Sequence, residues 1–311
     1  AVAVNGIVAL GFNRAIGYAA LYRANVEAGT VTVTSSLTGD TTVITTSLVL
    51  GGVAVGATVA LAQIASQNVA LVDLTGSVVK AGTLNVNAGT SSSPYNSQAI
   101  VTVVTGTAGA IAAALNFAIA LNASSNKATV VGTSGSLSGT NVNIYAEGNT
   151  RAYAIIANAS IGGFSMNISA SIAWLKSTQE ASLSSGATIV LTGTLNVTSK
   201  QNSTLNTYSN FLLQITDRLT DIVSGKFSSM AQAYIFSASA GVAVASANVA
   251  VATADASGKA IVKASNLTAG GAINVYSYGS STANAKVDNI TFAVASAGLM
   301  TGYSYAAGTF E

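Results

Sequence analysis

The sequence predicts an all-β protein, a right-handed parallel β-helix (β-solenoid) that carries one inserted amphipathic helix. Three observations lead to this fold class. A short motif recurs along the chain, extended segments alternate large and small side chains, and charged residues make up only 7% of the 311 residues. Self-similarity at a near-constant interval is typical of repeat proteins. A period of two places successive side chains on opposite faces of a sheet.

The recurring motif is AGTLNV at Ala81, and close copies of it begin at Ala28, Ser138, Thr192 and Ala269. Its glycine returns at intervals of 53, 57, 54 and 77 residues, at positions Gly29, Gly82, Gly139, Gly193 and Gly270. A repeat stack grows along one axis, so chain length does not count domains. We expect a single solenoid over residues 1–311, with about five units of about 54 residues plus the start of a sixth.

Each unit is predicted to form two coils of about 27 residues, so that about ten or eleven coils stack to a length of about 50 Å at the usual strand spacing. Parallel stacking explains why equivalent positions keep the same character in successive units, because each side chain lies over its own copy. An array of β-sandwiches, with four antiparallel strands per unit, is the main structural alternative.

The first element of a unit is a long uncharged strand, as in GGVAVGATVALAQI from Gly51. One face carries Val53, Val55, Val59 and Leu61, and the other face carries Ala and Thr with Gly56. We expect the bulky row to fill the interior and the small row to form a flat outer face. The same element returns at 115–121 and at 166–174, which predicts that the only tryptophan, Trp174, packs in the core instead of stacking on a sugar.

The second element carries most of the basic residues and is predicted to be a solvated face: Arg23, Lys80, Lys127, Lys176, Lys259 and Lys263. The motif strand follows, and its glycine is expected to adopt a turn conformation closed to other residues. Leu84 and Val86 are expected to point inward and Asn85 outward. The asparagines that recur there are predicted to form a hydrogen-bonded ladder along the stack, from Asn85 through Asn143 and Asn196 to Asn274.

The last element alternates again, as in the segments that begin at Thr41, Ser97, Arg151 and Lys286. The fourth interval is longer by about 20 residues, and the excess lies in 209–230, from Ser209 to Met230. Apolar residues recur there at three-to-four spacing, with Asp217, Arg218 and Asp221 opposite. This pattern predicts one amphipathic helix on the surface of the stack, with its apolar face inward.

The composition argues against several functions. The 12 basic and 10 acidic residues are scattered singly, so there is no basic stripe for nucleic acid. The chain has no cysteine or histidine, which removes the usual zinc ligands and the Ser-His-Asp arrangement. Asp217 and Asp221 are one helical turn apart, but Arg218 beside them indicates a solvated helix face. We therefore expect no enzyme, and no catalytic, cofactor-binding or metal-binding residue.

Two further binding functions are set aside for similar reasons. The aspartates are isolated and the nonapeptide that clusters carboxylates around calcium is absent. Thr30, Thr32 and Thr34 form a row that suggests ice binding, but the other copies replace these threonines with Asn, Leu and Val. The uncharged run 106–124 is about long enough to span a bilayer. Its asparagines and its alternation in other copies argue against a membrane span.

Three quoted stretches carry a family resemblance: the strand GVAVASANVAVATADASGKA, the motif GGAINVYSYGS and the strand TANAKVDNITFAVASAG. Their succession resembles the β-strand-repeat passengers of large secreted bacterial filamentous adhesins, the filamentous-haemagglutinin-like and leukotoxin-type family. The likeness covers the chain except 209–230. It implies a parallel β-helix at the bacterial surface or released from it, with roles in adhesion or cell contact.

We therefore expect a structural or adhesive segment of a secreted or surface-exposed bacterial repeat protein, located outside the cell or on its surface. The expected partners are copies of itself or adjacent repeats of the same polypeptide, together with a host-cell or surface receptor. The chain begins and ends in the same phase of the repeat, which suggests a segment of a longer protein. The alternatives are a self-assembling subunit of an extracellular filament and, third, a β-helix enzyme that acts on polysaccharide.

Overall fold

The computed structural model describes residues 1–202 and 230–311, which form strands joined by short connections, with no helix among them. The strands are β1 (Val2–Asn13), β2 (Ile16–Tyr22), β3 (Val26–Ser35), β4 (Thr38–Leu50), β5 (Val53–Ile64), β6 (Gln67–Asp73), β7 (Val78–Ala88), β8 (Tyr95–Asn122), β9 (Ser125–Gly132), β10 (Ser136–Leu191), β11 (Leu195–Gln201), β12 (Ala231–Ala269), β13 (Ile273–Gly279) and β14 (Ala283–Ala307). All pairings between them are parallel. The predicted all-β fold with parallel strands is confirmed, and the antiparallel alternative is wrong.

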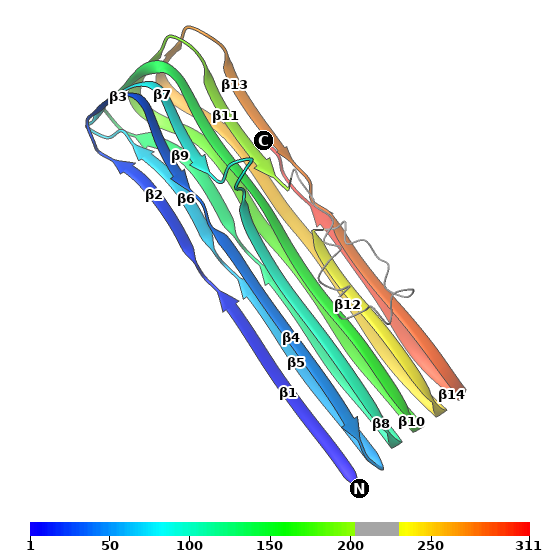
Figure 1. The fold of residues 1–311 in the computed structure, drawn as a ribbon. Coiled ribbons are helices and arrows are strands. Elements are labelled where there is room, and N and C mark those ends of the chain that lie inside the picture. The colour runs from blue at the N-terminus through cyan, green and yellow to red at the C-terminus, as the bar shows by residue number, and fades with distance from the viewer. Residues whose placement is uncertain (203–229) are drawn as a thin grey trace.

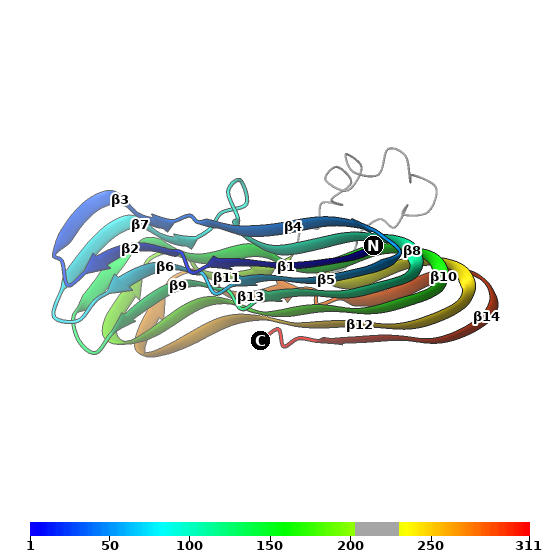
Figure 2. The ribbon, with the colours of Figure 1, turned by 90° about the horizontal axis from the view of Figure 1, so that it is seen from below.

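The strands form one strongly curled sheet whose two halves face each other as layers (Figure 2). Layer one holds β1, β2, β5, β6 and β9, and layer two holds β3, β4, β7, β11 and β13. The long strands β8, β10, β12 and β14 pass from layer two into layer one by bending near 109–110, 162–163, 241–242 and 293–294. We call the end of the body with this bend the corner end. We call the opposite end, where short connections such as 74–77 join the layers, the loop end.

One sequence repeat makes one circuit of the two layers. Val53 of β5 lies opposite Val2 of β1 on one side and opposite Ile111 of β8 on the other. The prediction of two coils per repeat is therefore wrong. The reason is that turn-like clusters within a layer, such as 37–40 and 148–150, lie where the chain continues in the same layer, so the chain turns back only at the two ends.

The long dimension of the body consequently runs along the strands, not along the stack (Figure 1). A layer of about 20 residues is about 65 Å long, whereas six stacked strands are about 25 Å deep. The predicted rod of about 50 Å along the stacking direction is replaced by a flat blade.

Glycines at the corner end allow the bend. An added Cβ on Gly162 would lie 2.4 Å from the backbone oxygen of Gly109, and one on Gly241 would lie 2.2 Å from that of Gly162. The motif glycines act in the same way, since a Cβ on Gly82 would lie 2.6 Å from the oxygen of Gly29. The expected turn conformation at the motif is wrong, because the positive φ angles of glycine fall at Gly76, Gly89, Gly132 and Gly135. The motif glycine instead permits close approach of neighbouring backbones.

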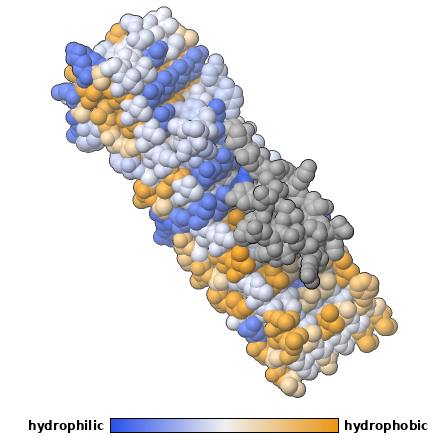
Figure 3. All heavy atoms as spheres, viewed as in Figure 1, coloured by the Kyte–Doolittle hydropathy of each residue, from blue (hydrophilic) through white to orange (hydrophobic). Residues whose placement is uncertain are grey.

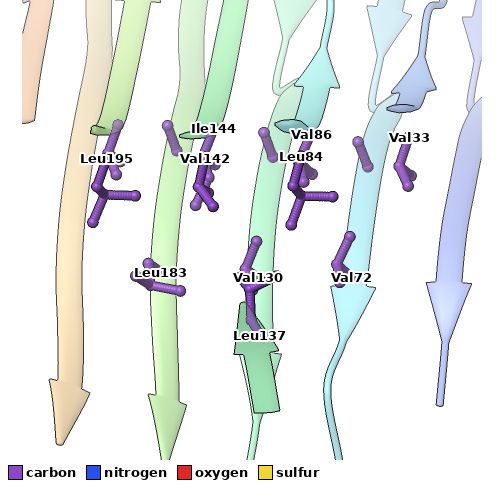
Figure 4. Packing of buried hydrophobic residues seen from close by; sticks show 14 of the residues in the cluster. Val33, Val72, Leu84, Val86, Val130, Leu137, Val142, Ile144, Leu183 and Leu195 are labelled. Carbon is purple, nitrogen blue, oxygen red and sulfur yellow. The ribbon is translucent and has the colours of Figure 1, made fainter. Parts of the chain in front are cut away.

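At the loop end, aliphatic side chains fill the space between the layers (Figure 4). Leu84 and Val86 of β7 are fully buried and lie in register with Val142 and Ile144 of β10. Val72, Val130 and Leu183 form a column on the facing layer. The inward direction of Leu84 and Val86 agrees with the sequence prediction. Burial of each such side chain contributes about 1.5–3 kcal/mol to the free energy of folding.

In the corner half of layer one the arrangement is reversed, whereas the facing strands of layer two still turn Val101, Val103 and Ile156 inward. On β5 the small residues Ala54, Ala60 and Ala62 are fully buried, and the bulky row Val53, Val55, Val59 and Leu61 points outward. The prediction that the bulky row fills the interior is wrong for every copy of this strand. Trp174 lies in the same outward row of β10 and is 44% exposed, so its predicted place in the core is wrong as well.

Polar side chains explain why the small rows point inward there. Thr105 Oγ1 donates a hydrogen bond of 2.7 Å to Asn116 Oδ1 across the bend of β8, and Asn158 Nδ2 donates one of 2.5 Å to Ser169 Oγ across the bend of β10. Asn167 of β10 donates to Ser239 Oγ of β12, also at 2.5 Å. These asparagines lie in the same inward row of layer one as the alanines and serines. This row therefore forms the hydrogen bonds between the layers, and its side chains are small enough to let the layers approach each other.

The predicted insert at 209–230 lies, apart from Met230, outside the described residues. Asn202 and Met230, which flank the gap, are neighbours in layer two, with Asn202 Nδ2 3.2 Å from Met230 Sδ.

Candidate interaction surfaces

The asparagine ladder lies on the outer face of layer two, near the loop end. Asn143 Nδ2 donates to Asn85 Oδ1 at 2.9 Å, Asn196 to Asn143 at 2.8 Å, and Asn274 to Asn196 at 2.8 Å. The series begins at Thr32, whose Oγ1 accepts from Asn85 at 3.4 Å. The predicted ladder is confirmed. Its hydrogen bonds all run in one direction, because the amide of each circuit donates to the oxygen of the circuit before it.

A shallow groove of about 320 Å³ lies beside this ladder. The connection between β7 and β8 forms one wall and contributes Thr90 and Ser91, and Tyr145 of β10 lies opposite. Ser91 Oγ and Tyr145 Oη are 2.8 Å apart, and Tyr145 also donates to the Glu147 carboxylate. The groove therefore presents hydroxyl and amide groups, which suit a polar ligand.

The surroundings of the groove shift the pKa values of Tyr145 and Lys200. Burial and the neighbouring Glu147 raise the pKa of Tyr145. The hydrogen bond to Tyr145 raises the pKa of Lys200, whose Nζ lies 5.2 Å from the ring centre of Tyr145. Both shifts favour the protonated forms of Tyr145 and Lys200, which donate hydrogen bonds.

The basic residues of the second element lie on the surface as predicted, and several are paired. Lys127 Nζ is 3.5 Å from Glu180, Lys80 Nζ is 3.3 Å from Glu27, and the Arg23 guanidinium is 3.5 Å from Asp73. The basic side chain of each pair is about half exposed, whereas Asp73 is buried, and the two lysine pairs stabilise the fold by only about 0–1 kcal/mol each. A second open groove of about 600 Å³ includes Glu27, Lys80 and Thr192.

The corner half of layer one carries an exposed apolar face that the sequence prediction had placed inside. Its outward side chains include Leu10, Val59, Phe117 and Trp174, which are 37–57% exposed. On the layer-two side, which faces the viewer in Figure 3, apolar residues also dominate the corner end, whereas hydrophilic residues gather toward the loop end. The sequence does contain a signal for this arrangement. An asparagine such as Asn116 lies in the row of small residues, and its hydrogen bond across the layers places that row in the interior.

Other candidate residues are not brought together. Thr30, Thr32 and Thr34 stand on β3 beside Thr83, Asn85 and Asn87 of β7. Among residues 1–202 and 230–311, no three Asp, Glu, His or Cys side chains are grouped as metal ligands. The pair Asp217 and Asp221 lies outside the described residues. Within the described ranges, no helix has the length and hydropathy needed to cross a membrane.

The sequence matches no protein-family model, and no curated protein or solved structure matches it significantly.

Proposed function

We propose that the chain is a non-catalytic structural and adhesive segment of a secreted or surface-exposed bacterial repeat protein, and that its curled parallel sheet is a right-handed β-solenoid. The observation that carries this proposal is the register of the circuits. Each motif strand lies directly over its copy, from Thr32 through Asn85, Asn143 and Asn196 to Asn274. A stack of this kind is extended by adding units, which is what a long surface protein needs.

Adhesion is tested by measuring binding of the labelled chain to cultured epithelial cells and to immobilised matrix proteins. We expect saturable binding by the folded chain and none by the heat-unfolded Leu84→Ala chain, which lacks the layered surface. Release of reducing sugar ends from bacterial or host polysaccharides, without stable binding, would instead support the polysaccharide-acting enzyme. Folded chain that neither binds nor cleaves would refute the adhesive role.

The direction of the ladder favours a second candidate, a filament built by end-to-end stacking. At the first rung the Thr32 hydroxyl accepts from Asn85 and has its own hydrogen to donate. At the last rung Asn274 uses its amide toward Asn196 and keeps its Oδ1 as an acceptor. A further circuit before Thr32 that ends like β13 would continue the ladder in the same direction. That circuit belongs either to the same polypeptide or to another copy of the chain.

Two substitutions at the first rung test this candidate by electron microscopy of the isolated chain. Thr32→Asn supplies a complete rung and is expected to lengthen any fibres. Thr32→Asp places a side chain of nearly the same size as asparagine at this rung, but it offers only acceptors to the Asn274 oxygen. We expect this variant to form shorter fibres. Short monodisperse particles from both variants and from the unchanged chain would favour the structural and adhesive segment over the filament.

A further inference from the structure

The exposed apolar face of layer one is built by six strands in register. Six outward positions on each of β1, β5, β8, β10, β12 and β14 contribute to it, and none of these positions carries a charge. The fifth of the six columns shows its character, with Leu10, Leu61, Ile119, Ile172, Val251 and Tyr303 side by side. We call these outward positions the apolar face.

The size of the apolar face is well above what a monomer usually exposes. Twelve residues along each strand and six strands across give an area of roughly 900–1,000 Å². Contiguous apolar patches on monomeric proteins rarely exceed about 300–600 Å². Even on its inner strands the side chains remain open, since Val59 is 37% and Phe117 is 38% exposed.

We propose that the apolar face is a dimer interface, and that its occupant is the same face of a second copy of this chain. Two such faces would bury up to about 1,900 Å², the area of a stable protein–protein interface. An uncharged face meets its own copy without like-charge repulsion, which is the condition for a two-fold symmetric contact. Alanines such as Ala57, Ala113 and Ala170 leave spaces among the bulky columns in which a partner's side chains fit.

The surroundings of the apolar face also resemble the anatomy of a protein interface, with an apolar centre and a polar rim. Directly beyond its end, Arg14 follows β1, and Lys176 of β10 lies in register with Asp255 of β12. The inner side of the same strands is held by the cross-layer bonds of Asn116 and Asn167, so the face is presented by a fixed scaffold.

A lipid surface is a weaker fit than a second copy. The outer face of layer two at the same level carries exposed apolar side chains such as Leu48 and Ile161, but it also carries Thr46 and the pair Lys286 and Asp288, whose charged atoms are 2.7 Å apart. A blade inserted into hydrocarbon would take these groups with it, together with the unpaired backbone groups of the edge strands β1 and β14. A partner that covers layer one alone leaves them in water.

The single tryptophan provides a direct probe, because Trp174 lies at the edge of the apolar face and is 44% exposed in one chain. Sedimentation velocity and tryptophan emission are measured over a concentration series of the 311-residue chain. We expect a monomer–dimer equilibrium, and emission that moves to shorter wavelength as the dimer forms.

The decisive variant is Ile172→Lys, which places a charge within the apolar face without touching the interior. We expect it to weaken dimerisation by about 30-fold or more, the effect of losing an interface hot spot, and to keep Trp174 emission at the long-wavelength position. Thr46→Lys is the matched control, because it adds the same charge to the outer face of layer two. It is expected to leave the dimer unchanged, and circular dichroism checks that both variants keep the strand content.

Three results would overturn the proposal. The first is a chain that stays monomeric with unchanged emission at every concentration. The second is association that survives Ile172→Lys and is lost in Thr32→Asp, which would place the contact at the end of the stack. The third is an emission shift that appears only with vesicles of neutral phosphatidylcholine while the chain remains monomeric, which would assign the face to lipid.

Discussion

At the loop end of this chain, aliphatic side chains such as Leu84 and Ile144 lie between the layers, and Lys80 and Lys127 lie in water. In the corner half of layer one, alanine and Asn116 lie between the layers, and Leu61 lies outside. Both ends belong to one sheet, and β10 and β12 run through both of them. The comparison teaches that the spacing of the layers and the hydrogen bonds between them decide which row faces inward, and hydropathy alone does not.

The largest expected effect comes from emptying the loop-end interior. Leu84→Ala removes a fully buried side chain and is expected to lower the free energy of unfolding by about 2–5 kcal/mol. Leu61→Ala makes the same change in the outward row at the corner end and is expected to cost the monomer about 0.5 kcal/mol or less. Urea unfolding of both variants at dilute concentration makes the comparison. Equal losses would mean that Leu61 is an interior residue and that the two ends do not differ.

The next effect tests how closely the layers approach at the corner end. Ala118 is fully buried, and Ala118→Leu is expected to destabilise the fold by about 1–3 kcal/mol because the interior has no room for the larger side chain. Its neighbour Phe117 points outward, so Phe117→Leu serves as the control and should change little. A stabilised Ala118→Leu chain would reveal an underfilled interior and would contradict the close approach of the layers.

A smaller loss is expected from the asparagine ladder. Asn143→Ala removes one bond to Asn85 and one to Asn196, each with a net contribution of about 0.5–1.5 kcal/mol, and half-exposure places the result toward the lower part of that range. The adjacent outward residue Thr198 provides the control substitution Thr198→Ala. Thermal unfolding checks both, and a loss no greater than that of Thr198→Ala would show that water replaces the ladder without cost.

Sequence reasoning reached the parts of this fold that depend on local pattern. The repeat, the parallel register, the inward Leu84 and the outward Asn85 ladder all follow from periodicity, because stacked copies keep the same environment. It failed where two rows were both compatible with an interior. At the corner end, the choice between the Leu61 row and the Ala60 row depends on cross-layer bonds such as that between Thr105 and Asn116, which join residues by a bend that periodicity does not reveal.

The prediction of two coils per repeat failed for a related reason. The clusters at 37–40 and 148–150 have the composition of turns, yet the chain on either side of each continues in the same layer. The chain reverses at the corner glycines instead, such as Gly109 and Gly162. A side chain at these positions would collide with the backbone of the neighbouring circuit, and the sequence alone does not show that this backbone lies there.

The smallest expected effect concerns pH and tests the charged surface of the loop end. Hydrogen bonds from Thr75, with a further contribution from Arg23, lower the pKa of Asp73. Because the folded state prefers the ionised form, this carboxylate stabilises the fold above its ordinary pKa of about 4, and that contribution is lost as pH falls through the lowered value. Asp73→Asn should therefore be less stable than the unchanged chain at pH 7 and should converge with it in acid. Glu27→Gln, at an exposed position on the same surface, is the control, and a constant difference for Asp73→Asn at all pH values would attribute its effect to packing instead of charge.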